Sequence, residues 1–199
     1  MLNSKTPRLP TYFISHGGGP WPYMKDDFGR AFGKLAASLQ NMPRQIGVTP
    51  RAVLAISGHW EERDFAVMAN PRPPMVYDYS GFPEHTYHVK YQAPGDPQLA
   101  ERVHTLIQSA GFASHLDHER GFDHGTFAPL VVVYPEANVP ILQLSIRADY
   151  DPKAHLELGK ALTPLRDEGV LILGSGLSYH NLRFFDERAR VPSKGFDDW

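Results

Sequence analysis

The sequence predicts a single α/β domain, in which a mixed or largely parallel central sheet is flanked by helices. Short apolar runs alternate along the chain with longer segments whose apolar residues recur every three or four positions. The apolar runs contain few alternating polar residues, which is typical of strands buried on both faces by helices. A length of 199 residues suits one domain with a substantial core, so we assign residues 1–199 to one domain.

The first third of the chain is predicted to contain strands at 11–16, 51–57 and 65–70, each a short apolar run. A helix is predicted over 23–40, where apolar residues recur at helical spacing, although Gly29 and Gly33 weaken it. These apolar residues are Phe28, Phe32, Leu35 and Leu39.

The middle of the chain begins with a segment, 71–95, that is rich in proline and aromatic residues and is predicted to be a loop. Asp96 precedes a proline and is predicted to cap a helix that Gly111 ends. The apolar run 129–134 fits either a strand or the start of a buried helix, and its pattern leaves the two open.

The last third is predicted to hold strands at 138–146 and 170–176, both rich in leucine and isoleucine. Between them, Asp151 and Pro152 carry the signature of a helix start. Pro164 is expected to bend the last turn of this helix, because proline cannot donate the helical hydrogen bond.

Composition excludes several classes of protein. The chain has no cysteine, so disulfides and thiolate metal sites are ruled out. A net charge of −2 gives no basis for nucleic acid or an anionic membrane as partner. The N-terminal residues contain no apolar signal core, and the apolar runs are too short to span a bilayer. We therefore predict a cytoplasmic location, and the oligomeric state is left open.

Three histidines fall at the ends of predicted strands, each with glycine nearby. His16 ends the first strand, His59 follows the second, and His180 follows the last. In open α/β sheets, ligands bind beyond the carboxyl ends of the strands. Neutral imidazole binds iron, copper and zinc. The pattern indicates a metal site, whereas a single histidine in such a place is more often structural.

Three glycines, at 17–19, follow His16. They fit a phosphate loop, clearance around a metal ligand, or only a turn. The phosphate loop is disfavoured, because no dinucleotide or P-loop motif is present and Pro20 and Pro22 remove backbone donors. Gly17 and Gly18 are therefore predicted to leave room for a planar substrate.

A fourth histidine, His124, lies between Asp123 and Gly125 in a predicted loop. It suits a metal ligand or a general acid/base. In the alternative, Asp123 caps the following segment and His124 faces water. Tyr87 and His88, in the aromatic loop, are predicted to line or cover a substrate pocket.

Six separated motifs together resemble the LigB-type extradiol aromatic ring-opening dioxygenases, in particular the DOPA 4,5-dioxygenase-like subgroup. The resemblance covers essentially the whole chain. The motifs are FISHGGGP, AISGHWEE, GFPEHTYHVKYQAPGDPQLA, GFDHGTFAPL, YDPKAHLELGKAL and GSGLSYHNLR.

The resemblance implies one divalent non-haem metal, with Fe2+ for turnover or Zn2+ as the bound ion, and an aromatic diol and O2 as substrates. His16 and His59 match metal-binding histidines of the family, and His124 matches the acid/base histidine. His180 matches a ligand of this subgroup, but the equivalent residue of related LigB enzymes stands just outside the ligand set. We keep both metal-binding and catalytic roles open for His180.

Family members continue past the segment that matches FDDW, and a further histidine or glutamate ligand normally lies there. The resemblance therefore implies a chain that lacks a C-terminal portion. The function expected is extradiol cleavage of a catechol. The alternatives are a metal- or partner-binding protein without catalysis on the same scaffold and a zinc-dependent hydrolase.

Overall fold

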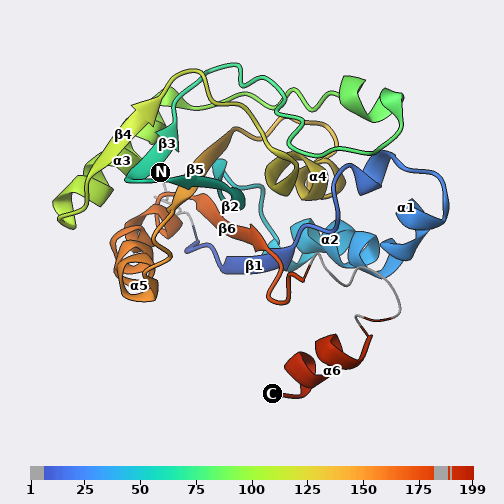
Figure 1. The fold of residues 1–199 in the computed structure, drawn as a ribbon. Coiled ribbons are helices and arrows are strands. Elements are labelled where there is room, and N and C mark those ends of the chain that lie inside the picture. The colour runs from blue at the N-terminus through green and yellow to red at the C-terminus, as the bar shows by residue number, and fades with distance from the viewer. Residues whose placement is uncertain (1–6, 182–187, 189) are drawn as a thin grey trace.

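The computed structural model describes residues 7–181, 188 and 190–199, and it confirms the α/β class (Figure 1). Within these residues, one sheet has the strand order β1-β6-β2-β5-β3-β4. All neighbouring strands are parallel except β3 and β5, which are antiparallel. The strands are β1 (Thr11–Ser15), β2 (Ala52–Glu62), β3 (Phe65–Met68), β4 (Ser114–Asp117), β5 (Ile141–Arg147) and β6 (Val170–Gly176).

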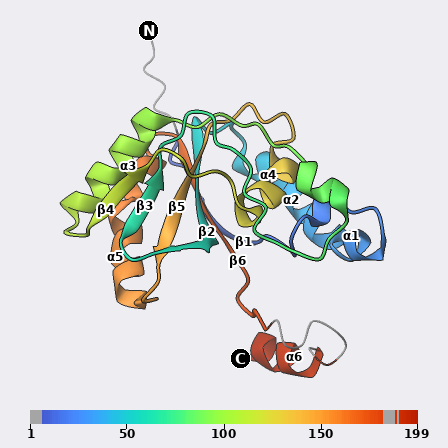
Figure 2. The same cartoon turned by 45° about the horizontal axis from the view of Figure 1, so that its top comes forward.

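Helices cover both faces of the sheet. Figure 2 shows α2 and α4 on one side and α3 and α5 on the other. Each face has its own apolar core, one around Phe127 and Leu130, the other around Val103 and Leu158. The helices are α1 (Asp27–Ala31), α2 (Gly33–Ile46), α3 (Pro97–Ser109), α4 (His124–Val133), α5 (Pro152–Ala161) and α6 (Arg190–Asp198), with short 3-10 helices η1 (Trp21–Tyr23), η2 (Glu84–His88) and η3 (Thr163–Arg166).

The helix predicted over 23–40 is divided in the structure. Asp26 caps α1, because its side chain accepts a hydrogen bond from the Gly29 backbone N–H at 3.1 Å. The chain leaves helical geometry at Phe32, and α2 then runs to Ile46, where Gly47 closes it in the left-handed conformation. Gly29 and Gly33, the two glycines that weaken the predicted helix, lie on either side of Phe32.

The apolar run 129–134 belongs to a helix, so the helical alternative is correct up to Val133. Helix α4 is ten residues long; it begins at His124, and Asp123 caps it. The residues from His124 to Leu130 are buried on every side of the helix. A helix buried all round has no polar stripe, which is why the sequence pattern alone did not separate it from a strand.

The Asp-initiated helices α3 and α5 are confirmed. Asp96 accepts from the Leu99 backbone N–H at 2.9 Å, and Asp151 accepts from that of Lys153 at 2.9 Å. After α5 the chain tightens into η3, which contains the proline expected to disturb this helix. Among the described residues, no helix has the length and apolar character needed to cross a membrane.

Candidate metal centre

His16 stands directly after β1 and is only 2% exposed. Its backbone carbonyl accepts a hydrogen bond from Trp21 Nε1 at 2.7 Å, and its ring Nδ1 lies 3.2 Å from the Ser175 hydroxyl. Gly17 has φ +78°, and a Cβ there would overlap the Trp21 indole. The first glycine of the GGGP motif is therefore needed for the turn that packs Trp21 behind His16.

His59 lies within β2, whereas the sequence predicted that the strand would end at residue 57. The pairing of β2 with β5 shifts register between Ile56 and Glu61, around this histidine. The His59 backbone N–H donates to the Ser57 hydroxyl at 3.2 Å. Such irregularities redirect a side chain relative to the regular strand. The sequence pattern gave no sign that the strand continues beyond it.

His124 is the first residue of α4 and is 7% exposed, so it lies neither in a loop nor in water. Its ring Nδ1 and its backbone N–H each lie 2.9 Å from Asp78 Oδ1. Asp78 comes from the loop over 71–95, which passes above α4 (Figure 1). Sequence reasoning missed Asp78, because a lone aspartate in a long loop gives no signal of its partner.

The rings of His16, His59 and His124 converge. The Nε2 atoms of His16 and His59 are 3.0 Å apart. The ring of His124 lies 4.0 Å from that of His59 and 5.3 Å from that of His16, measured between centroids. One nitrogen from each of the three lies within 4.8 Å of the others. Nitrogen ligands about 2.0–2.1 Å from zinc have comparable mutual spacing.

The hydrogen bonds assign the proton positions on two of these rings. The Ser175 hydroxyl donates its only proton to the Gly125 carbonyl, so it accepts from His16 Nδ1–H. An ionised carboxylate only accepts, so His124 Nδ1 donates to Asp78. In the neutral form of each ring Nε2 is then the unprotonated nitrogen, and that of His16 faces His59. Two lone pairs held in one buried cluster suit a shared cation.

Electrostatics keep the rings of His16 and His59 neutral, the form that binds a metal. Burial, with the neighbouring histidines, lowers the pKa of His16 from 6.5 to about 3. Burial and His124 also lower the pKa of His59. Although burial opposes it, hydrogen bonding from His124 lowers the pKa of Asp78. Neutral imidazoles beside a carboxylate form a donor set that fits one divalent ion.

The lowered pKa of His16 predicts acid sensitivity of the metal-free protein. Between pH 6.5 and about 3 the unfolded chain binds a proton that the folded His16 refuses, so the free energy of unfolding falls as the pH falls through this window. Urea denaturation at pH 7.5 and pH 5.0 measures the loss. His16→Gln should reduce this pH dependence; an identical dependence in both proteins would contradict the assignment.

His180 stands beside the cluster, with its ring centroid 6.5 Å from that of His59. Its side chain lines both cavities described below. Among the described residues, the histidine nitrogens that lie within 4.8 Å of one another come from His16, His59 and His124. The metal-binding and catalytic roles of His180 therefore stay predictions.

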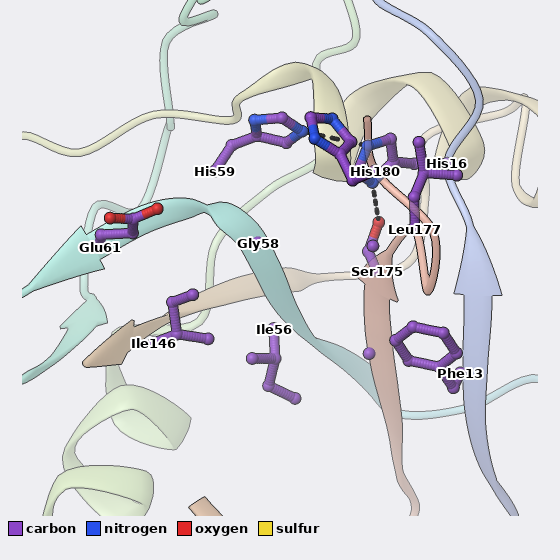
Figure 3. A pocket seen from close by; sticks show the side chains of 12 residues that line it. Phe13, His16, Ile56, Gly58, His59, Glu61, Ile146, Ser175, Leu177 and His180 are labelled. Carbon is purple, nitrogen blue, oxygen red and sulfur yellow. Dashed lines mark hydrogen bonds between the residues drawn. The ribbon is translucent and has the colours of Figure 1, made fainter. Parts of the chain in front are cut away.

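Two cavities meet at the histidines. One, of about 540 Å³, is lined by Gly17, Gly18, Asp78 and aromatic side chains including Phe28 and Phe82. The other, of about 520 Å³, lies on the sheet side of the cluster. Figure 3 shows the rings of His16, His59 and His180 at one end of this second cavity and apolar side chains at the other; the apolar side chains are Phe13, Ile56 and Ile146.

Tyr87 and His88, two further residues predicted to contact substrate, lie apart from the linings of these two cavities. The Tyr87 hydroxyl accepts from the Phe82 backbone N–H at 3.3 Å, and its ring packs against Tyr79. The side chain of His88 is 71% exposed and pairs with Glu84 at 2.9 Å. In the described part of the chain, Tyr87 and His88 are absent from the linings of both cavities. Their contact with substrate stays a prediction.

A buried carboxylate, that of Asp123, connects the segments that carry His59 and His124. Asp123 is 0% exposed and caps α4 by accepting from the Thr126 backbone N–H at 3.1 Å. It also accepts from Ser57 at 2.7 Å, from Arg120 at 2.8 Å and from Gln143. Ser57 in turn holds the backbone of His59. Asp123 therefore joins β2 to the helix that carries His124.

Comparisons with known proteins show which proteins this chain is similar to. A 4,5-DOPA dioxygenase extradiol of Beta vulgaris is 43% identical over 171 residues, which cover 85% of this chain and 62% of the relative. The protein of that name in Escherichia coli K12 is 39% identical over 178 residues, which cover 88% and 62%. The chain thus spans less than two thirds of the length of these relatives.

The fold also matches a solved structure. The crystal structure of an uncharacterized protein from Escherichia coli K12 superposes with a TM-score of 0.69 at 34% identity, over 88% of this chain and 63% of that one. The LigB family, described as the catalytic LigB subunit of aromatic ring-opening dioxygenase, matches residues 10–199. With this match across nearly its whole length, the chain belongs to the LigB family.

Proposed function

We propose that the protein is an extradiol dioxygenase, which opens the ring of a catechol, a DOPA-like diol, with O2 at a single divalent metal. The observation that carries the proposal is the convergence of three histidine rings beside two cavities; the rings come from the end of β1, from within β2 and from the start of α4. Membership of the LigB family and the names of the relatives support the same reaction class.

His16 and His59 would hold the metal, with His180 as a third ligand. The ring of His16 is buried and that of His59 is half-buried, and both have a lowered pKa, so each ring is neutral at neutral pH and keeps one nitrogen free to bind a metal. Bound Fe2+ would supply a centre that takes both catechol oxygens and lets electron density reach O2, whereas Zn2+ would hold the same ligands without redox chemistry.

His124 would manage the protons of the reaction. Asp78 accepts from its Nδ1–H, so Nε2 is the basic atom of this ring. Nε2 can accept a proton from a catechol hydroxyl and later return it to an oxygen of the opened ring. His124 lines the first cavity together with Gly17 and Gly18, which would give a ring access to that nitrogen.

The walls of the first cavity suit an aromatic substrate. Phe28 and Phe82 pack against each other with centroids 5.5 Å apart, and Tyr79 packs on Phe82 at the same distance. Such rings favour stacked or edge-to-face contact with a planar ligand. Tyr87 lies behind Tyr79, so it and His88 would act from the outer part of this loop if they reach the substrate.

The test is turnover by protein loaded with Fe2+. We expect a catechol supplied with air to consume O2 and give the yellow ring-opened semialdehyde, followed by its visible absorbance and by an oxygen electrode. The Escherichia coli relative, loaded in the same way, is the positive control. Iron binding without O2 consumption for any catechol, while the control turns over, would contradict the proposal and favour a binding protein on this scaffold. Zinc-dependent hydrolysis that is indifferent to O2 would also contradict it.

A further inference from the structure

We propose that Asp78 is a positioning residue that fixes both the orientation and the tautomer of His124, so that Nε2 faces the metal centre as a base. The inference rests on the proposed function for its catalytic consequence, but the orientation itself is a property of the protein without substrate. The residue comes from the segment 71–95, whereas the three histidines of the cluster come from the end of β1, from β2 and from the start of α4.

The geometry of the contact is specific. A single oxygen, Oδ1, lies 2.9 Å from both the ring Nδ1 and the backbone N–H of His124. The second oxygen lies 3.9 Å from His59 Nδ1, which is too long for a hydrogen bond. The Asp78 side chain is 21% exposed. Asp78 therefore acts chiefly on His124 and only weakly on the ligand His59.

The position of this carboxylate explains why the contact is stable. His124 opens α4, so its backbone N–H lacks a partner within the helix, and Asp78 satisfies it. A carboxylate at a helix N-terminus also interacts favourably with the helix dipole. Fixing the backbone and the ring of one residue through the same oxygen restricts how the imidazole can rotate. The ring is thereby held edge-to-face with that of His16, at an interplanar angle of 78°, and tilted by 44° against that of His59.

Other nearby carboxylates have different partners. Glu61 accepts from the Tyr150 hydroxyl, and Glu62 accepts from Trp60 Nε1 at 2.9 Å. Asp123 is buried one residue before His124, but its side chain accepts from Ser57, Arg120, Gln143 and the Thr126 backbone N–H. Asp78 is thus the carboxylate whose hydrogen bond determines which nitrogen of His124 carries the proton.

The first measurement is structural and needs no substrate. In the metal-free and zinc-loaded proteins, 15N NMR of the imidazole nitrogens is expected to show His124 as a single tautomer with Nδ1 protonated. Asp78→Ala should give a mixture of tautomers. Asp78→Asn should keep the single form, because the backbone N–H of His124 selects the amide oxygen at the Oδ1 position. A single unchanged tautomer in Asp78→Ala would overturn the inference.

The second measurement separates kcat from metal binding. For Asp78→Ala we expect kcat to fall about 100-fold, in line with loss of an oriented acid/base. Metal affinity should stay within about threefold of the parent, whereas losing a partner that orients a metal ligand costs about 10- to 100-fold in affinity. Asp78→Asn should recover kcat to within about tenfold of the parent. Asp167→Ala, an exposed aspartate paired with Arg8, is the matched control.

The outcomes distinguish the two proposals. An intact kcat in Asp78→Ala, or a loss of metal affinity that fully accounts for the loss of rate, would contradict the role assigned to Asp78. If the parent protein turns over no catechol, the proposed function fails, while the tautomer measurement still decides whether Asp78 positions His124. Thermal unfolding of both Asp78 variants, compared with Asp167→Ala, verifies that each is folded.

Discussion

His16→Ala is expected to abolish metal binding and with it turnover. The variant removes the most buried imidazole of the cluster, whose Nε2 lies 3.0 Å from that of His59. Removing a residue that hydrogen-bonds to a metal ligand lowers metal affinity about 10- to 100-fold. Removing the proposed ligand His16 itself should lower the affinity by more than that. Isothermal titration with Zn2+ measures the affinity, and O2 uptake with Fe2+ and a catechol measures turnover.

The control for this variant is His118→Ala, which removes an exposed histidine of the same chain. It should bind metal as the parent does. His16→Ala leaves the support of the turn in place, because Trp21 bonds to the backbone carbonyl of residue 16 and not to its ring. A folded His16→Ala protein with the metal affinity of the parent would show that the ion, if one binds, lies elsewhere.

Asp123→Ala is expected to have the largest effect on stability, a loss of about 3–5 kcal/mol in the free energy of unfolding. The carboxylate is fully buried and accepts hydrogen bonds from side chains of three separate segments. Alanine would leave the charged Arg120 and the buried Ser57 and Gln143 without this acceptor. Urea denaturation of the metal-free protein measures the change.

Asp96→Ala is the matched control, because Asp96 caps α3 as Asp123 caps α4 but lies nearer the surface. Its loss should cost about 1 kcal/mol, the typical value of an N-cap. Equal losses in the two variants would contradict the view that Asp123 does more than cap a helix. Asp123→Ala should also weaken metal binding, because Ser57 joins Asp123 to the backbone of His59.

Local sequence signals predicted the regular parts of the fold. The strand at 170–176 and the Asp–Pro helix starts were confirmed, because burial pattern, proline and capping act within a few residues. The predictions failed where tertiary contacts override them. The helix over 23–40 breaks at Phe32, and β2 continues past residue 57 to Glu62 because the sheet pairs around its irregularity.

Some residues of the candidate site could likewise be predicted from local sequence patterns, and others could not. His16 and His59 could be chosen from the sequence, because histidines beside glycines at predicted strand ends are a local pattern. His124 could be chosen because it lies beside Asp123 in one of the family motifs. The sequence could not show that the ring of His124 lies closer to that of His59 than the ring of His180 does, since this depends on distances between residues more than 50 positions apart. Glu61 and Glu62 also lie close to His59 in the sequence, but in the structure they accept hydrogen bonds from Tyr150 and Trp60.

The sequence by itself determined the α/β class, the absence of thiolate chemistry and the histidines on which a metal site depends, since each follows from residue type and short-range spacing. Only the tertiary structure decided that Asp78 contacts His124, that Asp123 joins β2 to α4, and that two cavities meet at the cluster. These features join segments far apart in the chain. Their geometry follows from packing across the sheet, which no local pattern of residues specifies.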